Sequence, residues 1–282
     1  MSKMKLLLQT YSLHLAFGRH TDCIHYPKKL TMEECLAKAK KWGFAGVQLD
    51  PTHLLHGTRE YGEQLKRTAC ELGLSLELGV CGFEPVQLRK KLLFAQSLGA
   101  CFIRIFDQGP RPRDPNETKK RLDSIRQDVE AIIPDLERTK ITLGWENHID
   151  YDTSEQLMVL EEVNHERFRA LFDVGNSMAF LEPPLETFRR LKKFIGGVHL
   201  KDYAMTGTTF GIKFYGTALG TGVIPLKEML SVLRNETNLA HLVYEQCIEP
   251  KSSDPQESIG FEENTLLKSL RYAKEDLGLE IC

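Results

Sequence analysis

Four side chains of the kinds that bind divalent metals follow apolar runs in the second half of the sequence. Glu146 lies in LGWENHID, Asp173 in LFDVGN, His199 in VHLKD and Glu245 in VYEQC. Three carboxylates packed together would repel one another, and a divalent cation removes that repulsion. A ligand set of three carboxylates and one imidazole suits Mn²⁺, Mg²⁺ or Co²⁺ better than it suits zinc in a site built from soft ligands. The pattern predicts one divalent ion, with manganese favoured and magnesium, cobalt and zinc as alternatives.

Charged residues accompany this set in otherwise apolar segments. Lys201 should face the same side of its strand as His199, because successive side chains of a strand alternate. It could hold a substrate carboxylate, a phosphate or an enolate oxygen, or it could pair with Asp202 or another acid. Arg104 lies in CFIRIF. A buried arginine needs an anionic partner, which is either a substrate anion or Glu77 on the preceding predicted strand.

Two histidines and a glycine-rich segment complete the candidates. His148 follows Glu146 closely and could bind substrate or shuttle a proton. His14, near the end of the first apolar run, could line the same pocket. The segment 203–225 is expected to be a long loop ending in LGTG. Its glycines would expose backbone N–H groups that could take a phosphate, or they would simply turn the chain.

Short apolar runs alternate along the chain with longer amphipathic ones. The predicted strands span 5–10, 46–50, 74–80, 101–106, 141–146, 168–173, 196–201 and 240–245. Helices are expected over 31–43, 84–99, 115–139, 182–196, 224–235 and 261–278, with Pro134 kinking or splitting the third. Eight such units in 282 residues predict an α/β fold, a single (β/α)8 TIM barrel domain over residues 1–282. An open doubly wound sheet is the alternative, but no glycine fingerprint follows the first run.

This fold would bring the four candidate metal ligands together. The carboxyl ends of barrel strands face the active site. The four residues end the fifth to eighth predicted strands, with separations of 27, 26 and 46 residues. These match one β–α unit, a second unit, and a unit with an insertion. Because neighbouring strands lie ~5 Å apart, the four side chains can converge on one point.

Composition limits the partners that the protein can have. A formal net charge of −2 gives no basic surface for nucleic acid. No run approaches the ~18 apolar residues that a membrane span needs. The seven cysteines are scattered without a CxxC pair, which favours reduced thiols and a cytoplasmic protein. A homodimer or a homotetramer is left open.

The phrases WENH, FDVGN, HLKD and LGTG resemble those of the xylose-isomerase-like TIM barrel superfamily, in particular its sugar phosphate isomerase/epimerase-like members. The resemblance covers nearly the whole chain. It implies that Glu146, Asp173, His199 and Glu245 ligate the metal. It also implies that Glu146 and Glu245 are catalytic and move protons on opposite faces of a metal-stabilised enediolate. Asn176 stands where many ketose 3-epimerases and apurinic-site endonucleases carry a histidine, and it is a candidate substrate contact.

These inferences predict a divalent-metal-dependent isomerase or epimerase that acts on a small keto sugar or sugar acid. A lyase of the decarboxylase or dehydratase type is the alternative, because loss of CO₂ from a β-keto acid gives the same kind of enolate. A non-catalytic sugar-binding barrel is a third possibility, and the complete ligand set argues against it.

Overall fold

The computed structural model describes residues 4–18, 29–107, 111–112 and 114–281. The barrel strands are β1 (Lys5–Gln9), β2 (Gly46–Leu49), β3 (Ser75–Cys81), β4 (Phe102–Phe106), β5 (Thr142–Glu146), β6 (Phe168–Asp173), β7 (Ile195–Leu200) and β10 (His241–Tyr244). These eight strands close into a barrel in the order β1-β10-β7-β6-β5-β4-β3-β2, which confirms the predicted (β/α)8 fold. Each predicted strand matches an observed one to within one or two residues.

Helices separate the strands along the chain. They are α1 (Met32–Lys41), α2 (Arg59–Leu72), α3 (Pro85–Leu98), α4 (Pro115–Thr139), α5 (Thr153–Val163), α6 (Pro184–Leu191), α7 (Leu226–Glu236) and α8 (Pro255–Glu275), with short 3-10 helices η1 (Thr10–Leu13), η2 (Pro51–His53) and η3 (Asn176–Phe180). The sequence analysis missed α2 and α5. Pro134 does not split α4, because the buried Ile132 and Leu136 on either side keep the helix packed through this point.

The chain divides into two compact units. The first comprises Met1–Leu54, Thr68–Ser75 and His199–Cys282, and the second Leu55–Arg67 and Leu76–Val198. The single domain over residues 1–282 therefore stays a prediction.

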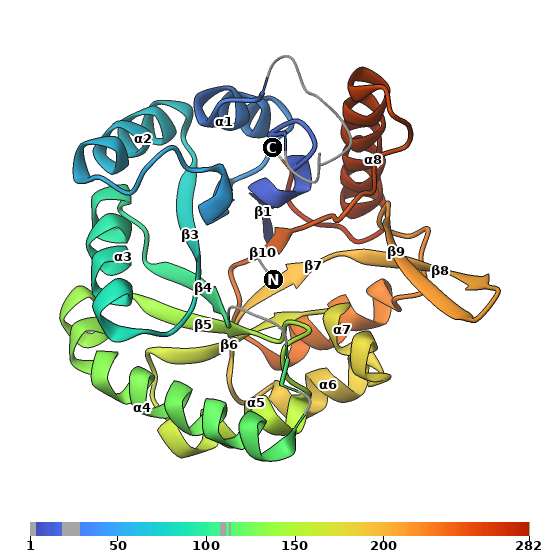
Figure 1. Cartoon of the computed structure of the whole chain (residues 1–282). Helices are drawn as coiled ribbons and strands as arrows, with labels where there is room; N and C mark the ends of the chain where they lie inside the picture. Colours follow the sequence, from blue (N-terminus) through green and yellow to red (C-terminus); the bar gives the residue numbers. More distant parts are fainter. Residues whose placement is uncertain (1–3, 19–28, 108–110, 113, 282) are drawn as a thin grey trace. The chain divides into compact units, whose positions relative to one another are not determined.

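The second unit carries β4, β5 and β6 in parallel register, with α3, α4 and α5 on their outer side (Figure 1). Glycines make room for the ring of Phe102 on this sheet. A Cβ atom at Gly197 would lie 2.8 Å from the Phe102 Cζ, and one at Gly144 would clash with the same ring. The small residues that open β7 are therefore a packing requirement of the sheet.

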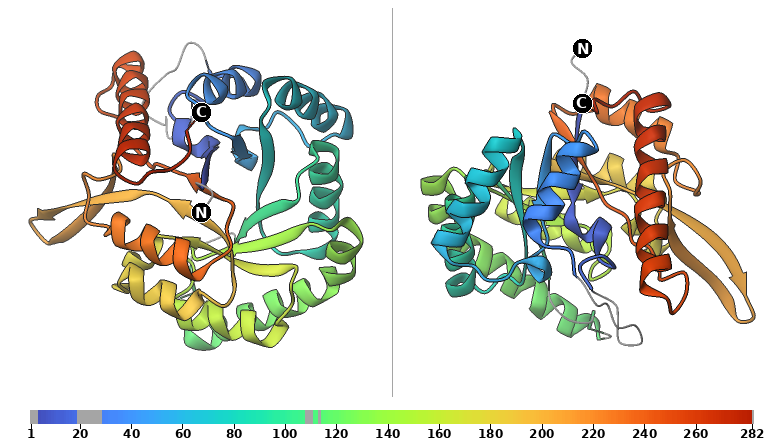
Figure 2. Two further views of the ribbon diagram at one scale, coloured as in Figure 1. Left: turned by 180° about the vertical axis from the view of Figure 1, so that it is seen from behind. Right: turned by 90° about the horizontal axis from the view of Figure 1, so that it is seen from above.

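The first unit contains a hairpin where the sequence analysis expected a long loop. β8 (Asp202–Thr208) and β9 (Gly211–Thr217) pair antiparallel directly after β7. Both views of Figure 2 show this hairpin extending outward next to α8. Its outer part exposes Met205, Phe210 and Ile212. The expectation of a loop over 203–225 was wrong. The strands were not recognised because apolar and polar residues alternate only weakly in this segment, and both faces of the hairpin are largely exposed.

Asp202 fixes the base of the hairpin and the glycine-rich turn that follows it. Its carboxylate accepts hydrogen bonds from the backbone N–H groups of Tyr203 (3.0 Å), Gly220 (3.0 Å), Gly222 (2.9 Å) and Ile224 (3.2 Å). The N–H groups that could have taken a phosphate thus bind a carboxylate of the protein itself, which favours the alternative that these glycines turn the chain. The glycines of LGTG serve to wrap the chain around Asp202.

The described residues contain no helix long and apolar enough to cross a membrane. Cys35, Cys70, Cys81, Cys101 and Cys247 are free thiols, and Cys23 and Cys282 lie outside the described residues. The cytoplasmic location and the oligomeric state stay predictions.

Replacing Asp202 with alanine should destabilise the protein. The change leaves four backbone N–H groups, of which that of Ile224 is buried, without their acceptor. Hydrogen bonds to charged groups contribute about 1.5–3 kcal/mol each. We expect the free energy of unfolding to fall by at least ~2 kcal/mol in denaturant titrations. Asp202→Asn keeps one acceptor oxygen and should lose less. Equal stability of Asp202→Ala and the wild type would contradict the anchoring role.

Candidate metal centre

Glu146 and Asp173 end neighbouring strands of the second unit, and Asn147 joins these two strand ends. The Asn147 side chain donates to the Asp173 backbone carbonyl at 2.9 Å and accepts from the Asp173 N–H at 2.6 Å. Both acidic residues are buried. These two hydrogen bonds fix the end of β5 relative to the end of β6. The backbone at Glu146 and Asp173, and with it the position of the two carboxylates, is therefore fixed as well.

The turn after β6 orients both carboxylates further. Asp173 Oδ1 accepts from the N–H groups of Gly175 (2.9 Å) and Asn176 (3.0 Å). The Asn176 side chain donates to Glu146 Oε1 at 3.2 Å. Asn176, which the sequence analysis took as a substrate contact, thus links the two carboxylates in this structure.

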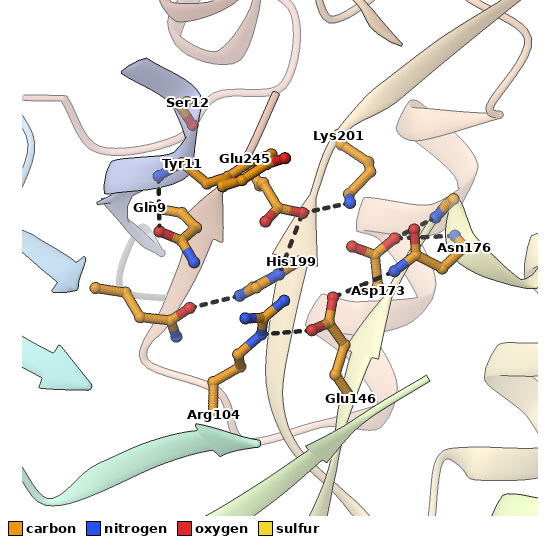
Figure 3. A network of polar contacts seen from close by, with 12 residues as sticks. Gln9, Tyr11, Ser12, Arg104, Glu146, Asp173, Asn176, His199, Lys201 and Glu245 are labelled. Carbon is orange, nitrogen blue, oxygen red and sulfur yellow. Dashed lines mark hydrogen bonds and ion pairs between the residues drawn. The ribbon is translucent and has the colours of Figure 1, made fainter. Parts of the chain in front are cut away.

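Arg104 contacts the other oxygen of Glu146. Its Nε lies 2.5 Å from Glu146 Oε2, and the side chains are 6% and 0% exposed (Figure 3). The guanidinium carbon also lies 4.3 Å from the centroid of the Phe106 ring. The sequence analysis weighed a substrate anion and Glu77 as partners of this arginine, and it did not consider Glu146. At this degree of burial a cation stabilises the charged form of the carboxylate.

His199 and Glu245 belong to the first unit, at the ends of β7 and β10. The His199 Nε2 lies 2.7 Å from Gln48 Oε1, an acceptor that places the imidazole proton on Nε2. The lone pair then lies on Nδ1, which is 3.6 Å from Glu245 Oε2. Proteins orient a metal-binding histidine through a hydrogen bond from the ring nitrogen that does not bind the metal. Gln48 is such a partner for His199.

Lys201 forms an ion pair with Glu245, and both side chains are buried. Figure 3 shows Glu245 between Lys201 and His199. Lys201 and His199 therefore approach the same carboxylate, as expected for alternate residues of one strand. An ion pair of this lysine with Asp202 or another acid was one of the predicted alternatives, and the acid is Glu245. Asp202 instead anchors the hairpin.

Three further side chains fix the chain on both sides of Glu245. The Gln246 side chain donates to the carbonyls of Ser12 and Glu262, each at 3.0 Å, and accepts from the Tyr244 hydroxyl at 2.6 Å. The Glu262 carboxylate accepts from the N–H groups of Leu15 (2.9 Å) and Ala16 (3.1 Å). This network connects β10, the segment after β1 and α8.

The two candidate histidines lie beside other groups. His14 Nδ1 is 2.9 Å from the Tyr11 carbonyl and 3.4 Å from Glu262 Oε1. His148 Nδ1 is 3.2 Å from Asp150 Oδ2. Burial by itself lowers the pKa of His148, but the hydrogen bond to Asp150 and the charges of Glu146 and Asp150 outweigh it and raise the pKa. A protonated His148 would add positive charge near Glu146.

Sequence reasoning missed Gln48, Asn147, Gln246 and Glu262. Gln48 carried a usable signal, because it is a polar residue within the buried run GVQL. The others are polar residues next to strand ends or on a helix, where a polar side chain is ordinary.

The four predicted ligands form a buried cluster that could hold a metal ion. Glu146, Asp173, His199 and Glu245 each offer one ligand atom, and these atoms lie within 4.8 Å of one another. Three carboxylates and one imidazole are a donor set that suits a divalent ion of hard or intermediate character. The residues present therefore fit the metal that the sequence predicts.

The model of the family described as xylose isomerase-like TIM barrel matches residues 36–269. With the closed barrel this defines the class of the protein: the chain belongs to the xylose isomerase-like TIM barrel family.

Proteins that this chain resembles carry names of different activities. A 3-oxo-isoapionate decarboxylase from Pectobacterium atrosepticum is 27% identical over 213 residues, which cover 74% of this chain and 74% of the relative. The crystal structure of D-psicose 3-epimerase in the presence of D-fructose has a TM-score of 0.73 and 14% identity, covering 98% of this chain and 100% of that one. The IOLI protein with a bound zinc atom has a TM-score of 0.69 and 15% identity, covering 95% and 98%. The two structural likenesses show the fold alone.

Metal binding should stabilise the folded protein. We expect Mn²⁺ to raise the melting temperature of EDTA-treated protein, since a ligand at 100 times its Kd adds ~2.7 kcal/mol to the stability of the state that binds it. Asp173→Asn should abolish most of this rise, while the exposed Asp276→Asn should keep it. A wild-type melting temperature that does not respond to Mn²⁺, Mg²⁺, Co²⁺ or Zn²⁺ would contradict the site.

Glu262 should make the stability depend on pH. Burial raises the pKa of its carboxyl group to about 8 from 4.5, against the opposing hydrogen bonds from Leu15 and Ala16. Between these two values the folded protein keeps a proton that the unfolded chain releases, so stability falls as pH rises. We expect the melting temperature of the wild type, relative to that of Glu262→Gln, to fall from pH 5 to pH 8 and to level off above. Parallel pH profiles for the two proteins would refute this.

Proposed function

We propose that this protein is a divalent-metal-dependent enzyme that forms an enolate from a small keto sugar acid, and that it does so by decarboxylation. The observation that carries this proposal is the pairing of each candidate catalytic glutamate with a buried cation. Arg104 contacts Glu146, and Lys201 contacts Glu245. The metal ligands in this proposal are Glu146, Asp173, His199 and Glu245.

Cations at both glutamates favour a lyase over an epimerase. An epimerase needs one carboxylate to remove a proton from carbon and another to return one. A carboxylate held by a guanidinium or an ammonium group is stabilised as the anion and is a weaker base. Decarboxylation requires no proton removal from carbon, since the electron pair of the breaking C–C bond forms the enolate while CO₂ leaves. One proton then goes to the carbon.

The substrate in this proposal is an anion, which Lys201 and Arg104 would help to bind. Both cations are at least nine-tenths buried, so their charges act with little screening by water. Lys201 Nζ would hold the substrate carboxylate or the enolate oxygen. A divalent ion bound by the ligand set would supply Lewis-acid stabilisation of negative charge on oxygen. The decarboxylase activity named for the relative from Pectobacterium atrosepticum supports this class of reaction.

Isomerisation or epimerisation is the second candidate function. It is favoured by the placement of Glu146 and Glu245 on β5 and after β10, where both belong to one cluster of potential ligands. In an epimerisation the two glutamates would remove and return a proton on opposite faces of one carbon of a keto sugar. In an isomerisation a proton would move between two adjacent carbons. Asn176 and His148 would contact the substrate in either reaction.

Carbon dioxide release separates these two functions. We expect the Mn²⁺-loaded enzyme to release one CO₂ per 3-oxo sugar acid consumed, and in D₂O to place one deuterium on the product. Deuterium in recovered ketose substrate, without CO₂ release, would instead support the isomerase. Lys201→Met should lower kcat/KM for the acid at least ~10-fold, or about 1.4 kcal/mol. The exposed Lys227→Met is the matched control and should behave as the wild type.

A further inference from the structure

A cavity lies in the first unit, between the β8–β9 hairpin and the segment that follows Glu245. Its volume is about 310 Å³, at the lower end of the range for ligand pockets. Side chains of Tyr11, His14, Tyr203, Phe214 and Tyr215 line it, together with the segment 247–250. Five rings on one small cavity form a surface that is suited to a flat, partly apolar group.

The cavity adjoins the proposed catalytic groups. Lys201 Nζ lies 5.8 Å from the centroid of the Tyr203 ring, and the same ammonium contacts Glu245. Burial raises the pKa of Tyr11, and the nearby Cys247 side chain and Glu245 carboxylate raise it further. Tyr11 and Tyr203, which line the cavity, therefore lie close to the Lys201–Glu245 pair, and Figure 3 shows Tyr11 beside Glu245.

The hairpin wall of the cavity is held in place by backbone contacts. A Cβ atom at Gly216 would clash with the Cys247 carbonyl, so only glycine lets β9 approach the segment after β10 this closely. Asp202 fixes the other strand at its base through four backbone N–H groups. The rings of Tyr11 and His14 stack with centroids 4.8 Å apart on the opposite wall. The two walls that line the space are thus anchored by different contacts.

We propose that this cavity is a subsite for a ring carried by the substrate, either a second sugar ring or an aryl group. The inference rests on the proposed function, because it places this ring next to the reacting keto acid. Aromatic side chains pack against the apolar face of a sugar ring or against an aryl ring, whereas a simple acid would leave the cavity filled with water. The substrate class is then a keto sugar acid with a ring substituent.

Binding of non-reacting probes tests this subsite. If the ring is a sugar, we expect cellobiose to bind at least ~10-fold more tightly than glucose. If the ring is an aryl group, we expect phenyl β-D-glucoside to bind at least ~10-fold more tightly than methyl β-D-glucoside. Calorimetry on the Mn²⁺-loaded protein measures all four. Phe214→Ala and Tyr215→Ala should remove the preference. Phe210→Ala is the matched control on the same hairpin, because Phe210 is 99% exposed and does not line the cavity.

Two results would overturn the subsite. One is that neither ring-bearing probe binds more tightly than its simple counterpart, including the case in which none of the four binds. The other is a preference that survives in Phe214→Ala and Tyr215→Ala proteins with wild-type melting temperatures. Neither result depends on turnover, so failure of the subsite is distinguishable from failure of the proposed decarboxylation, which CO₂ release measures.

Discussion

The repulsion between buried carboxylates is the constraint on which the rest of this structure depends. Glu146, Asp173 and Glu245 bring three potential anions into a cluster whose ligand atoms lie within 4.8 Å of one another. Burial makes each charge costly unless it is paired or hydrogen-bonded. Arg104 and Lys201 each contact one glutamate, and backbone N–H groups contact Asp173. A divalent ion would compensate the charge further.

The surrounding chain holds these groups by contacts that do not take part in the proposed reaction. Asn147 joins two strand ends in one unit, and Gln246 ties the residue after Glu245 to Ser12 and Glu262 in the other. Gln48 orients His199 from a strand far away in sequence. Each ligand is thus positioned by a polar partner that is itself buried. Such packing keeps side chains within the narrow geometry that metal binding requires.

Much of the fold could be predicted from the sequence, because parallel barrel strands are buried on both faces and appear as short apolar runs. The acidic and imidazole residues at the ends of four such runs were recognisable because polar side chains stand out directly after an apolar run. The β8–β9 hairpin was not, since its residues are largely exposed and lack a clear alternation of apolar and polar side chains. The contacts of Arg104 with Glu146 and of Asp202 with the glycine-rich turn also escaped prediction. For Arg104 and for Asp202 the sequence offers several possible partners of the same chemistry. Only the folded structure shows which of them makes the contact.

Anomalous X-ray scattering from crystals loaded with Mn²⁺ tests the central claim most directly. The account predicts a single strong peak at the manganese absorption edge, within about 2.5 Å of one ligand atom from each of Glu146, Asp173, His199 and Glu245. A fully loaded crystal with no peak among these four residues, or with its peak at another group of residues, would contradict it.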